Sequence, residues 1–541
     1  MSLRVITQEE RFLAHPVDRT NTGAARPRNR HFAPLVTVLV AALALVASAF
    51  GQGGDQVRTL VVAGEAVGEN FMPAAGTQGW AHTWVLSNVY EGLYTSRDQK
   101  TLEPSLALNH EVSEDGLTYT FTLRENVVFH DGTPFNAGAV EFNYMRYIDR
   151  DHPYYESNAP WHTAFLGGVT NVQAVDEYTV QFTLEAPRAA LPASLSTYYS
   201  GIVSPTAIEA HGVADIGRFP VGTGPYRFEQ AQRGNQATLV AFPDYWGGRP
   251  GVERVVIRVV PDDQAMLASL LAGEVDLTPF VDLKDLPVLR RQPQFNVVVV
   301  PATATGYLAM NAANPAVADV RIRRAIAHAI NEQEIIDVIF EGEADPAAGL
   351  ISLPMWGYAS ELEDYYPYDP TQARELLSDV GATPALTLNV QSSGFWPRMA
   401  ELIQAQLAAV GLDVSIEQVD PAAFYGRMTE GAHHMFLGDA AAQTPDPEDL
   451  FWTLFGCENP RSKRWGHCDE SFDSLVAEQS AMSEQSERRE VLVDLQRMLL
   501  DEAVQIPLYY SRFAYIVNSQ LEGFTPLPVR FIYLDDAYWQ E

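Results

Sequence analysis

Cysteine and lysine are both scarce in this chain. Its 541 residues include two cysteines and only three lysines, Lys100, Lys284 and Lys463. Lysine and arginine together number 36, against 69 aspartates and glutamates, so the formal net charge is −33. A protein that binds nucleic acid needs a basic face for the phosphates. The composition therefore argues against a nucleic-acid partner, while a hydrophobic content of 47% is typical of a globular protein with large cores.

Motifs that would indicate a common hydrolase or a nucleotide-binding protein are also missing. The chain contains no G-x-S-x-G and no H-E-x-x-H, and none of its lysines follows a glycine as in a P-loop. The nearest glycine motif is Gly222-Thr223-Gly224. Arg227 replaces the third glycine of a dinucleotide-binding fingerprint, and Pro225 removes an N–H from the anion site. We interpret the motif as a turn before a strand, with glycines in backbone angles that other residues resist.

The longest hydrophobic run lies near the N-terminus. Leu35–Phe50 follows a basic leader and ends in Ala47-Ser48-Ala49, a pattern typical of signal-peptide cleavage. The run is shorter than the roughly 20 residues of a transmembrane helix. We expect residues 1–49 to be a cleaved export signal, with an uncleaved anchor as the alternative. No cysteine follows directly, so we expect a soluble protein outside the cytoplasm without a lipid anchor.

The two cysteines, Cys457 and Cys468, lie in the short stretch FGCENPRSKRWGHCDESF. In an exported protein such a pair most simply forms one disulfide across a loop. A loop this short would stabilise the fold by somewhat under about 3 kcal/mol. The alternative is a metal site that uses His467 beside Cys468, but a second pair of ligands at useful spacing is missing. We predict the disulfide, and we expect neither a metal nor a cofactor.

The periodicity of the sequence changes along the chain. Residues 117–135 and 172–184 alternate apolar and polar side chains, as β-hairpins do. From about residue 250 strands alternate with helices, and residues 385–419 form one complete β-α-β unit. One of the expected helices begins at Asp369-Pro370 and ends at Gly381. Strands that alternate with helices imply parallel sheets covered by helices, so the sequence predicts an α/β fold.

Several of these segments together resemble a known family. They are FPVGTGPYRFEQ, DYWGGRPGVERVVIRVVPDD, LLAGEVDL, VRIRRAIAHAIN, YDPTQARELL and DPEDLFWTLFGC. They are similar, in the same order, to the periplasmic dipeptide- and oligopeptide-binding proteins of ABC importers, solute-binding protein family 5. The resemblance implies a two-lobed periplasmic-binding-protein clamshell, type II-like, that closes on a solute and delivers it to a membrane permease. It implies no enzymatic activity.

The resemblance also implies how the chain is divided. The first lobe is discontinuous in this family and carries an extra β-rich subdomain. We therefore expect a signal peptide at 1–49, lobe I at 50–80, its β-rich subdomain at 81–219, lobe I again at 220–300, lobe II at 301–505 and a C-terminal return to lobe I at 506–541. The hinge should lie near Val300–Thr303 and Ile506–Tyr509, where the chain crosses between the lobes.

A peptide ligand would set requirements on the pocket, because enclosing an unpaired charge costs several kcal/mol. An acid is needed for the ammonium end, and an arginine suits the carboxylate because its planar fork binds both oxygens. The resemblance places the acid before an Asp-Pro motif like Asp446-Pro447, and the arginine before a helix like MAELIQAQL. Asp439 and Arg398 are the nearest counterparts, although Asp439 lies farther from Asp-Pro than is usual. The other ligand-binding candidates are Thr77, Trp80, His82 and Trp396.

Other functions remain open at this point. The solute could be a nickel chelate, which the adjacent His433 and His434 could bind, an oligosaccharide or an opine-like compound. A secreted hydrolase is a rival of another class, and the missing nucleophile motif argues against it. A chaperone-like binder of unfolded chains is a third. The partners that we expect are a short peptide or another small solute and the permease subunits of an ABC importer, and we expect the protein to be a monomer.

Overall fold

The computed structural model describes residues 58–73, 80–156, 166–381 and 384–540; the side chain of Trp80 is not described. The predicted signal peptide and Thr77 therefore lie outside the described residues. Val57–Glu541 forms one compact unit. Within the described part, no helix is both long enough and apolar enough to cross a membrane.

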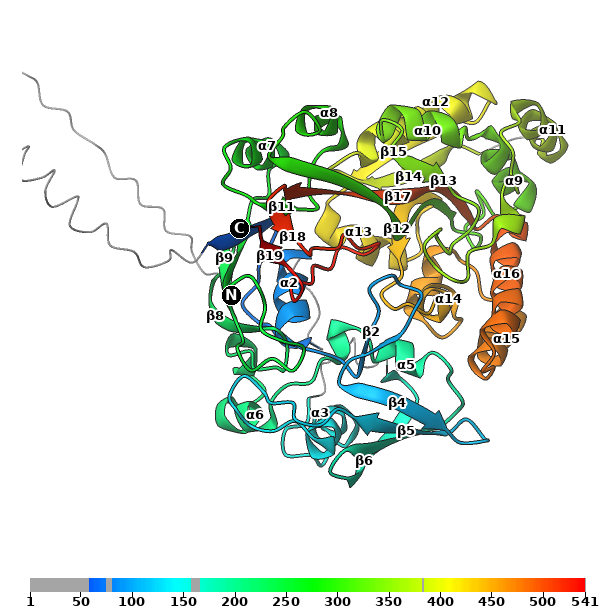
Figure 1. The fold of residues 1–541 in the computed structure, drawn as a ribbon. Helices are drawn as coiled ribbons and strands as arrows, with labels where there is room; N and C mark the ends of the chain where they lie inside the picture. The colour runs from blue at the N-terminus through cyan, green and yellow to red at the C-terminus, as the bar shows by residue number, and fades with distance from the viewer. Residues whose placement is uncertain (1–57, 74–79, 157–165, 382–383, 541) are drawn as a thin grey trace, which may run out of the picture. The chain divides into compact units, whose positions relative to one another are not determined.

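An 11-stranded mixed sheet dominates the described residues (Figure 1). Its order is β15-β14-β16-β12-β17-β11-β1-β10-β9-β8, and β13 also pairs with β17. Two long antiparallel strands, β12 and β17, join its two halves. The strands are β1 (Thr59–Gly64), β8 (Tyr226–Gln232), β9 (Gln236–Ala241), β10 (Arg254–Val259), β11 (Leu277–Thr278), β12 (Phe295–Met310), β13 (Ala344–Pro346), β14 (Leu386–Gln391), β15 (Val414–Val419), β16 (Met435–Ala441) and β17 (Gln505–Asn518).

Helices cover both faces of this sheet, and short 3₁₀ turns connect several of the elements. The helices are α2 (Trp80–Val89), α3 (Ala137–Ile148), α5 (Leu191–Ser194), α6 (Pro205–His211), α7 (Asp263–Leu271), α8 (Leu286–Leu289), α9 (Val320–Ala329), α10 (Glu332–Ile339), α11 (Pro370–Val380), α12 (Trp396–Ala409), α13 (Pro421–Thr429), α14 (Glu448–Phe455), α15 (Glu470–Ser480) and α16 (Gln485–Asp501). The α/β class predicted from the sequence is thus confirmed.

The end of strand β12 is buried on both faces of the sheet. Leu308 and Met310 of β12 enter the core beneath α9, α10 and α12, whereas Tyr307 and Ala309 enter the core beneath α13, α14 and α16. Successive side chains of a strand point to opposite faces, so a strand covered on both faces needs apolar residues at every position. This requirement accounts for the unbroken apolar run at the end of β12.

A separate four-stranded antiparallel sheet lies within the region expected to be β-rich. Its order is β4-β5-β7-β6 (Figure 1). Phe121 and Phe182 point inward against α3, whose first turn is capped by the side chain of Asn136. Only one face is covered, which explains the strict alternation seen in the sequence. The strands of this and the two smaller sheets are β2 (Tyr94–Thr95), β3 (Glu103–Pro104), β4 (Ala107–Val112), β5 (Thr118–Leu123), β6 (Val169–Asp176), β7 (Thr179–Leu184), β18 (Leu521–Glu522) and β19 (Tyr538–Trp539).

The β-α-β unit is confirmed, because β14 and β15 are parallel neighbours joined through α12. The side chain of Asp369 caps α11, and Gly381 follows its end with a positive φ of 90°. The ladder between β12 and β17 shifts register between Pro301 and Thr305 and again after Gly306. This irregularity falls where we expected the hinge.

The Gly222-Thr223-Gly224 turn leads into β8, as predicted, but the reason for its glycines is different. Neither glycine has a positive φ. A Cβ on Gly222 or Gly224 would instead overlap backbone carbonyls at the end of α2. The N–H of Gly224 donates to one of them, the carbonyl of Val89, at 3.0 Å. Close approach of two backbones, and not an unusual backbone angle, requires glycine here.

Candidate functional site

A cavity of about 130 Å³ lies against β12 and β17 beside the register shift. Residues of these strands line it, together with Phe395, residues 439 and 441–443 at the end of β16 and just after it, and the segment 529–531. Its charged and aromatic lining consists of Phe395, Asp439, Tyr509, Phe513, Arg530 and Phe531. Apolar walls with a few charged groups are typical of small-molecule sites.

Asp439 supplies the negative charge of the cavity. It lies in β16 opposite Gly306 of β12, and the hydroxyl of Tyr425 donates to its Oδ1 at 3.1 Å. The carboxylate is accessible to solvent within the cavity, yet protein surrounds it on the other sides. This burial raises the pKa of Asp439, against the lowering effects of Tyr425 and the positive Arg530. A cation brought by a ligand would therefore be attracted to this carboxylate.

Gly306 allows an aromatic ring to approach Asp439. A Cβ at Gly306 would overlap the ring of Tyr509, which lines the cavity. The neighbouring Gly438 similarly leaves room for the rings of Phe436 and Tyr307. Gly306 and Gly438 therefore make space for large rings beside β12 and β16.

Arg530 supplies the positive charge. Its guanidinium carbon is 4.7 Å from the ring centroids of both Phe280 and Phe513, so two aromatic rings pack against the charged group. The backbone is held as well, because the buried indole N–H of Trp84 donates to the Arg530 carbonyl at 2.7 Å. Burial lowers the pKa of Arg530, while the charges of Glu65 and Asp439 act in the opposite direction. An arginine remains charged even after such a shift.

The predicted ligand-binding residues take different positions. Asp439 lines the cavity, and so does Phe395, the neighbour of Trp396. Trp396 itself is the first residue of α12 and is packed into the hydrophobic core. Its ring centroid is 4.7 Å from that of Phe395. His82 is fully buried in α2 and stacks on Phe71, and this burial lowers its pKa to about 4. A histidine in this position is a neutral part of the core.

Arg398 lies on the exposed side of the first turn of α12. Its Nη2 donates to the carbonyl of Val338 at 3.2 Å, and it is not among the described residues that line the cavity. Trp80 forms the first residue of α2. The ligand-binding roles predicted for Arg398, Trp80 and the other candidates stay predictions.

Arg530, Gln443 and Tyr509 also line the cavity, and they were not predicted from the sequence as ligand-binding residues. Arg530 lies in the stretch PLPVRFIYLDD, which has neither helical nor strand periodicity. Tyr509 lies in a mostly apolar strand, where its side chain could equally belong to the core. No local sequence signal distinguishes these residues, because the fold alone brings segments near 440, 510 and 530 together.

Three larger cavities lie elsewhere in the described residues. One, of about 210 Å³, contains Glu91, which accepts hydrogen bonds from the hydroxyls of Thr223 and Tyr245 and from the indole of Trp246. Its carboxylate is already satisfied by the protein. A second, of about 490 Å³, has carboxylates such as Glu332 in its wall but no basic residue among the described ones. The third, of about 260 Å³, is lined by Glu69, Asn70, Ala214, Arg218 and Arg233. None of the three is lined by residues of β12.

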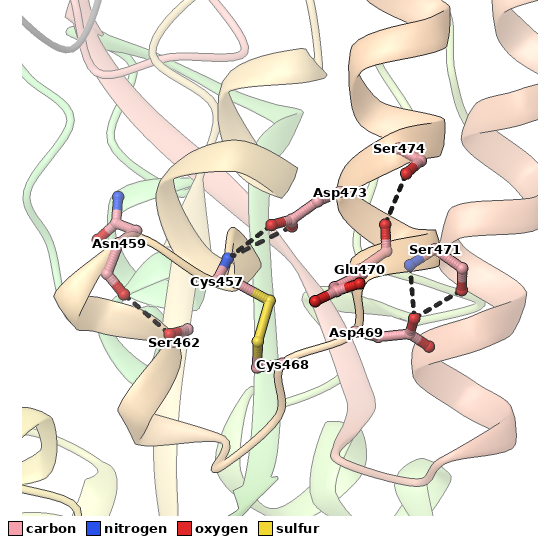
Figure 2. The surroundings of a disulfide bond; sticks show 9 residues. All are labelled: Cys457, Asn459, Ser462, Cys468, Asp469, Glu470, Ser471, Asp473 and Ser474. Atoms are coloured by element: carbon pink, nitrogen blue, oxygen red, sulfur yellow. Dashed lines mark hydrogen bonds between the residues drawn. A yellow bond between two sulfur atoms is a disulfide. The ribbon is translucent and has the colours of Figure 1, made fainter.

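The predicted disulfide between Cys457 and Cys468 is present, with the two Cα atoms 4.9 Å apart (Figure 2). The backbone N–H of Cys457 also donates to the carboxylate of Asp473 in α15 at 3.1 Å. Asp469, directly after the second cysteine, caps the same helix. The disulfide therefore holds the loop after α14 against the start of α15.

The adjacent histidines considered for a metal chelate are engaged by backbone. Nε2 of His433 lies 2.7 Å from the carbonyl of Arg464, and Nδ1 of His434 accepts the N–H of Thr387 at 3.0 Å. No group of three potential metal ligands occurs among the residues that the structure describes. These histidines serve to join loops and strands.

Comparison with known proteins identifies the family. The model of the bacterial extracellular solute-binding proteins, family 5 Middle, matches residues 101–462. The chain belongs to this family. It is 31% identical over 513 residues to di/tripeptide-binding protein 2 of Pseudomonas aeruginosa (strain UCBPP-PA14), covering 90% of this chain and 96% of that protein. It is 29% identical to the dipeptide-binding protein of Escherichia coli (strain K12), covering 88% and 93%.

A solved structure extends the likeness to three dimensions. The ABC transporter-associated periplasmic binding protein DppA of Helicobacter pylori, in complex with the peptide STSA, matches with a TM-score of 0.78 and 28% identity. The match covers 90% of this chain and 98% of that structure. The family 5 chain thus has the two-lobed clamshell fold that its sequence led us to expect. The long β12–β17 pair joins the halves of its large sheet.

Proposed function

We propose that this family 5 protein binds short peptides outside the cytoplasm and delivers them to the permease of an ABC importer. The cavity beside β12 and β17 is the proposed ligand site, and the observation that carries the proposal is its accessible carboxylate, Asp439, in a wall that also carries several aromatic rings. A peptide ammonium would satisfy this carboxylate. The relatives named for peptides, at 29 to 31% identity over nearly their whole length, support the same ligand class.

The proposed mechanism is closure of two lobes, without chemistry on the solute. We assign lobe I to residues 50–80, 220–300 and 506–541, with its β-rich subdomain at 81–219, and lobe II to 301–505. The hinge would use the interrupted ladder near Pro301–Thr305, where fewer regular hydrogen bonds resist bending. A ligand that contacts both lobes favours the closed state by its differential affinity.

The proposal includes export. Residues 1–49 would be removed after translocation, and the mature protein would act as a soluble monomer without a lipid anchor. Intact mass and N-terminal sequencing of protein secreted from cells would test the cleavage near Ala49. An unprocessed N-terminus would support the anchored alternative instead.

The first experiment is mass spectrometry of the purified protein, first native and then denatured, to weigh any retained ligand. Masses that fit short peptides would support the proposal, and titration calorimetry with di- and tripeptides would then give the length preference. Asp439→Asn should weaken binding of peptides with a free N-terminus more than binding of their N-acetyl forms. A single non-peptide mass, or turnover of added peptides, would contradict the proposed function.

A further inference from the structure

The cavity of about 490 Å³ is separate from the proposed peptide site. It is lined by the start of α10, residues 345–348 and parts of the segments 353–368 and 500–507. None of these residues lines the cavity beside β12 and β17. Its volume falls within the range of small-molecule sites, about 300–1,000 Å³. The proposed peptide binding leaves this cavity without a role.

The charged lining of this cavity is acidic throughout in the described part of the chain. The acidic residues are Glu332, Asp345, Glu363 and Asp364. Asp345 pairs with Arg512, and Glu363 accepts a hydrogen bond from the hydroxyl of Tyr358. The other two carboxylates have no hydrogen bond or ion pair within residues 58–73, 80–156, 166–381 and 384–540. Half of the acidic lining is therefore left without a partner.

Glu332 is the more enclosed of the two unpartnered acids. Protein surrounds its carboxyl on most sides, although the residue keeps an opening to solvent. Burial raises the pKa of Glu332 to about 8, and the negative charge of Asp364 adds to this effect. Glu332 is also the first residue of α10, where the helix favours a negative charge but supplies no partner to the carboxylate. A cation from solution would offset the cost of enclosing this charge.

Much of the remaining wall is aromatic or aliphatic. It includes Tyr365, Tyr366, Tyr368, Leu353, Leu362 and Ile506. The hydroxyls of Tyr365 and Tyr366 donate to Asp501 and to the carbonyl of Leu500. Their rings, and not their hydroxyls, are therefore left for a ligand. Aromatic rings attract organic cations, and the aliphatic residues can pack against a carbon chain.

A metal ion fits this lining less well than an organic cation does. No group of three potential metal ligands occurs in the part of the chain that the structure describes. From the enclosed carboxylate and the aromatic wall we infer that the cavity binds a small alkylammonium ion, with its ammonium group at Glu332 and its carbon chain along the tyrosine and aliphatic wall. A short diamine is the expected ligand class, because a second ammonium group can pair with Asp364. This site is additional to the proposed peptide site.

Titration calorimetry of the purified full chain with putrescine (1,4-diaminobutane) and with n-butylamine tests the inference. At about pH 8.5 Glu332 is largely ionised, while alkylamines stay protonated. Sodium chloride at about 150 mM screens the diffuse attraction of cations to a chain of formal net charge −33. The wild-type protein should bind one putrescine, about two- to fivefold more tightly than n-butylamine, since the pair with the exposed Asp364 adds little.

Glu332→Gln keeps the shape of the side chain and removes its charge. It should weaken putrescine binding by about 10- to 100-fold, as expected for loss of a hydrogen-bonded charge. Glu334→Gln is the matched control on the same helix, because Glu334 lies outside the cavity lining and accepts a hydrogen bond from Gln406 at 2.8 Å. This control should change the affinity by less than about twofold in screening salt.

Asp364→Asn, at an exposed position, decides the question if Glu332→Gln does not fold. It should weaken putrescine binding by about two- to fivefold, with a melting curve like that of the wild type. Absence of putrescine binding to the wild-type protein would overturn the inference, and so would equal weakening by Glu332→Gln and Glu334→Gln. Loss of binding in Asp439→Asn instead would place the amine in the cavity beside β12 and β17. Displacement of putrescine by an equal concentration of calcium or magnesium would indicate a metal site and overturn the assignment.

Discussion

The buried ion pair between Arg488 and Asp446 makes a quantitative prediction about stability. Arg488 in α16 donates through both terminal nitrogens to Asp446, at 2.6 and 2.9 Å, and its side chain is only 5% exposed, against 7% for Asp446. It also donates to the amide oxygen of Gln479 at 2.7 Å. Arg488→Met keeps the apolar stem but leaves the carboxylate of Asp446 buried without its cation. Such a loss costs about 3–5 kcal/mol.

The neighbouring arginine is a matched control on the same helix. Arg489 pairs with Glu361 through two hydrogen bonds of 3.0 and 2.9 Å, but these side chains are 35% and 41% exposed. Water screens the pair, so Arg489→Met should cost about 1 kcal/mol or less. Geometry is similar in the two pairs, and burial is the main difference between them.

Equilibrium urea unfolding of both variants, followed by tryptophan fluorescence, measures the difference. Trp356 is a local probe, because its ring lies 5.2 Å from the Arg488 guanidinium carbon. We expect the free energy of unfolding to fall by at least about 2 kcal/mol more in Arg488→Met than in Arg489→Met. Adding Asp446→Asn to Arg488→Met should restore part of the loss, since it removes the uncompensated charge. Equal losses in the two single variants would refute the reasoning.

Three further predictions concern other parts of the fold. Reducing the Cys457–Cys468 disulfide should lower the free energy of unfolding by up to about 3 kcal/mol, and an unchanged melting temperature in dithiothreitol would contradict this. Burial raises the pKa of Asp449 to about 8. The folded protein therefore keeps this carboxyl protonated between about pH 4 and pH 8, whereas the unfolded chain releases the proton above about pH 4. Stability should therefore fall as pH rises from about 4 to 8, and Asp449→Asn should remove up to about 2.7 kcal/mol of that fall between pH 5 and 7. Gly306→Ala should cost about 1–3 kcal/mol by overlap with an adjacent ring, whereas Gly426→Ala, in an open helical position, should be neutral or stabilising by up to about 1 kcal/mol in the same unfolding assay.

Local patterns predicted several elements because their causes are local. Asp369, Pro370 and Gly381 mark the ends of α11 in the sequence because capping uses residues within one turn of the helix. The cysteine pair indicated its disulfide because a short loop brings the sulfurs together. The turn at Gly222-Thr223-Gly224 was predicted, but the reason that it needs glycine was not. The space for a side chain is taken by the backbone at the end of α2, which is far away in the sequence.

The sequence alone therefore determined the fold class, the family, the ends of helices and the disulfide, all of which follow from short-range patterns or from motifs in a conserved order along the chain. Only the tertiary structure decided which charges share a cavity. It placed Arg530 and Asp439 in the lining of one cavity, while it left Arg398 at the surface and His82 in the core. The physical reason is that pairing of β16, β12 and β17 in one sheet, and the packing of the C-terminal segment beside them, bring residues near 440, 510 and 530 together. Burial, which sets the cost of a charge, depends on that long-range packing.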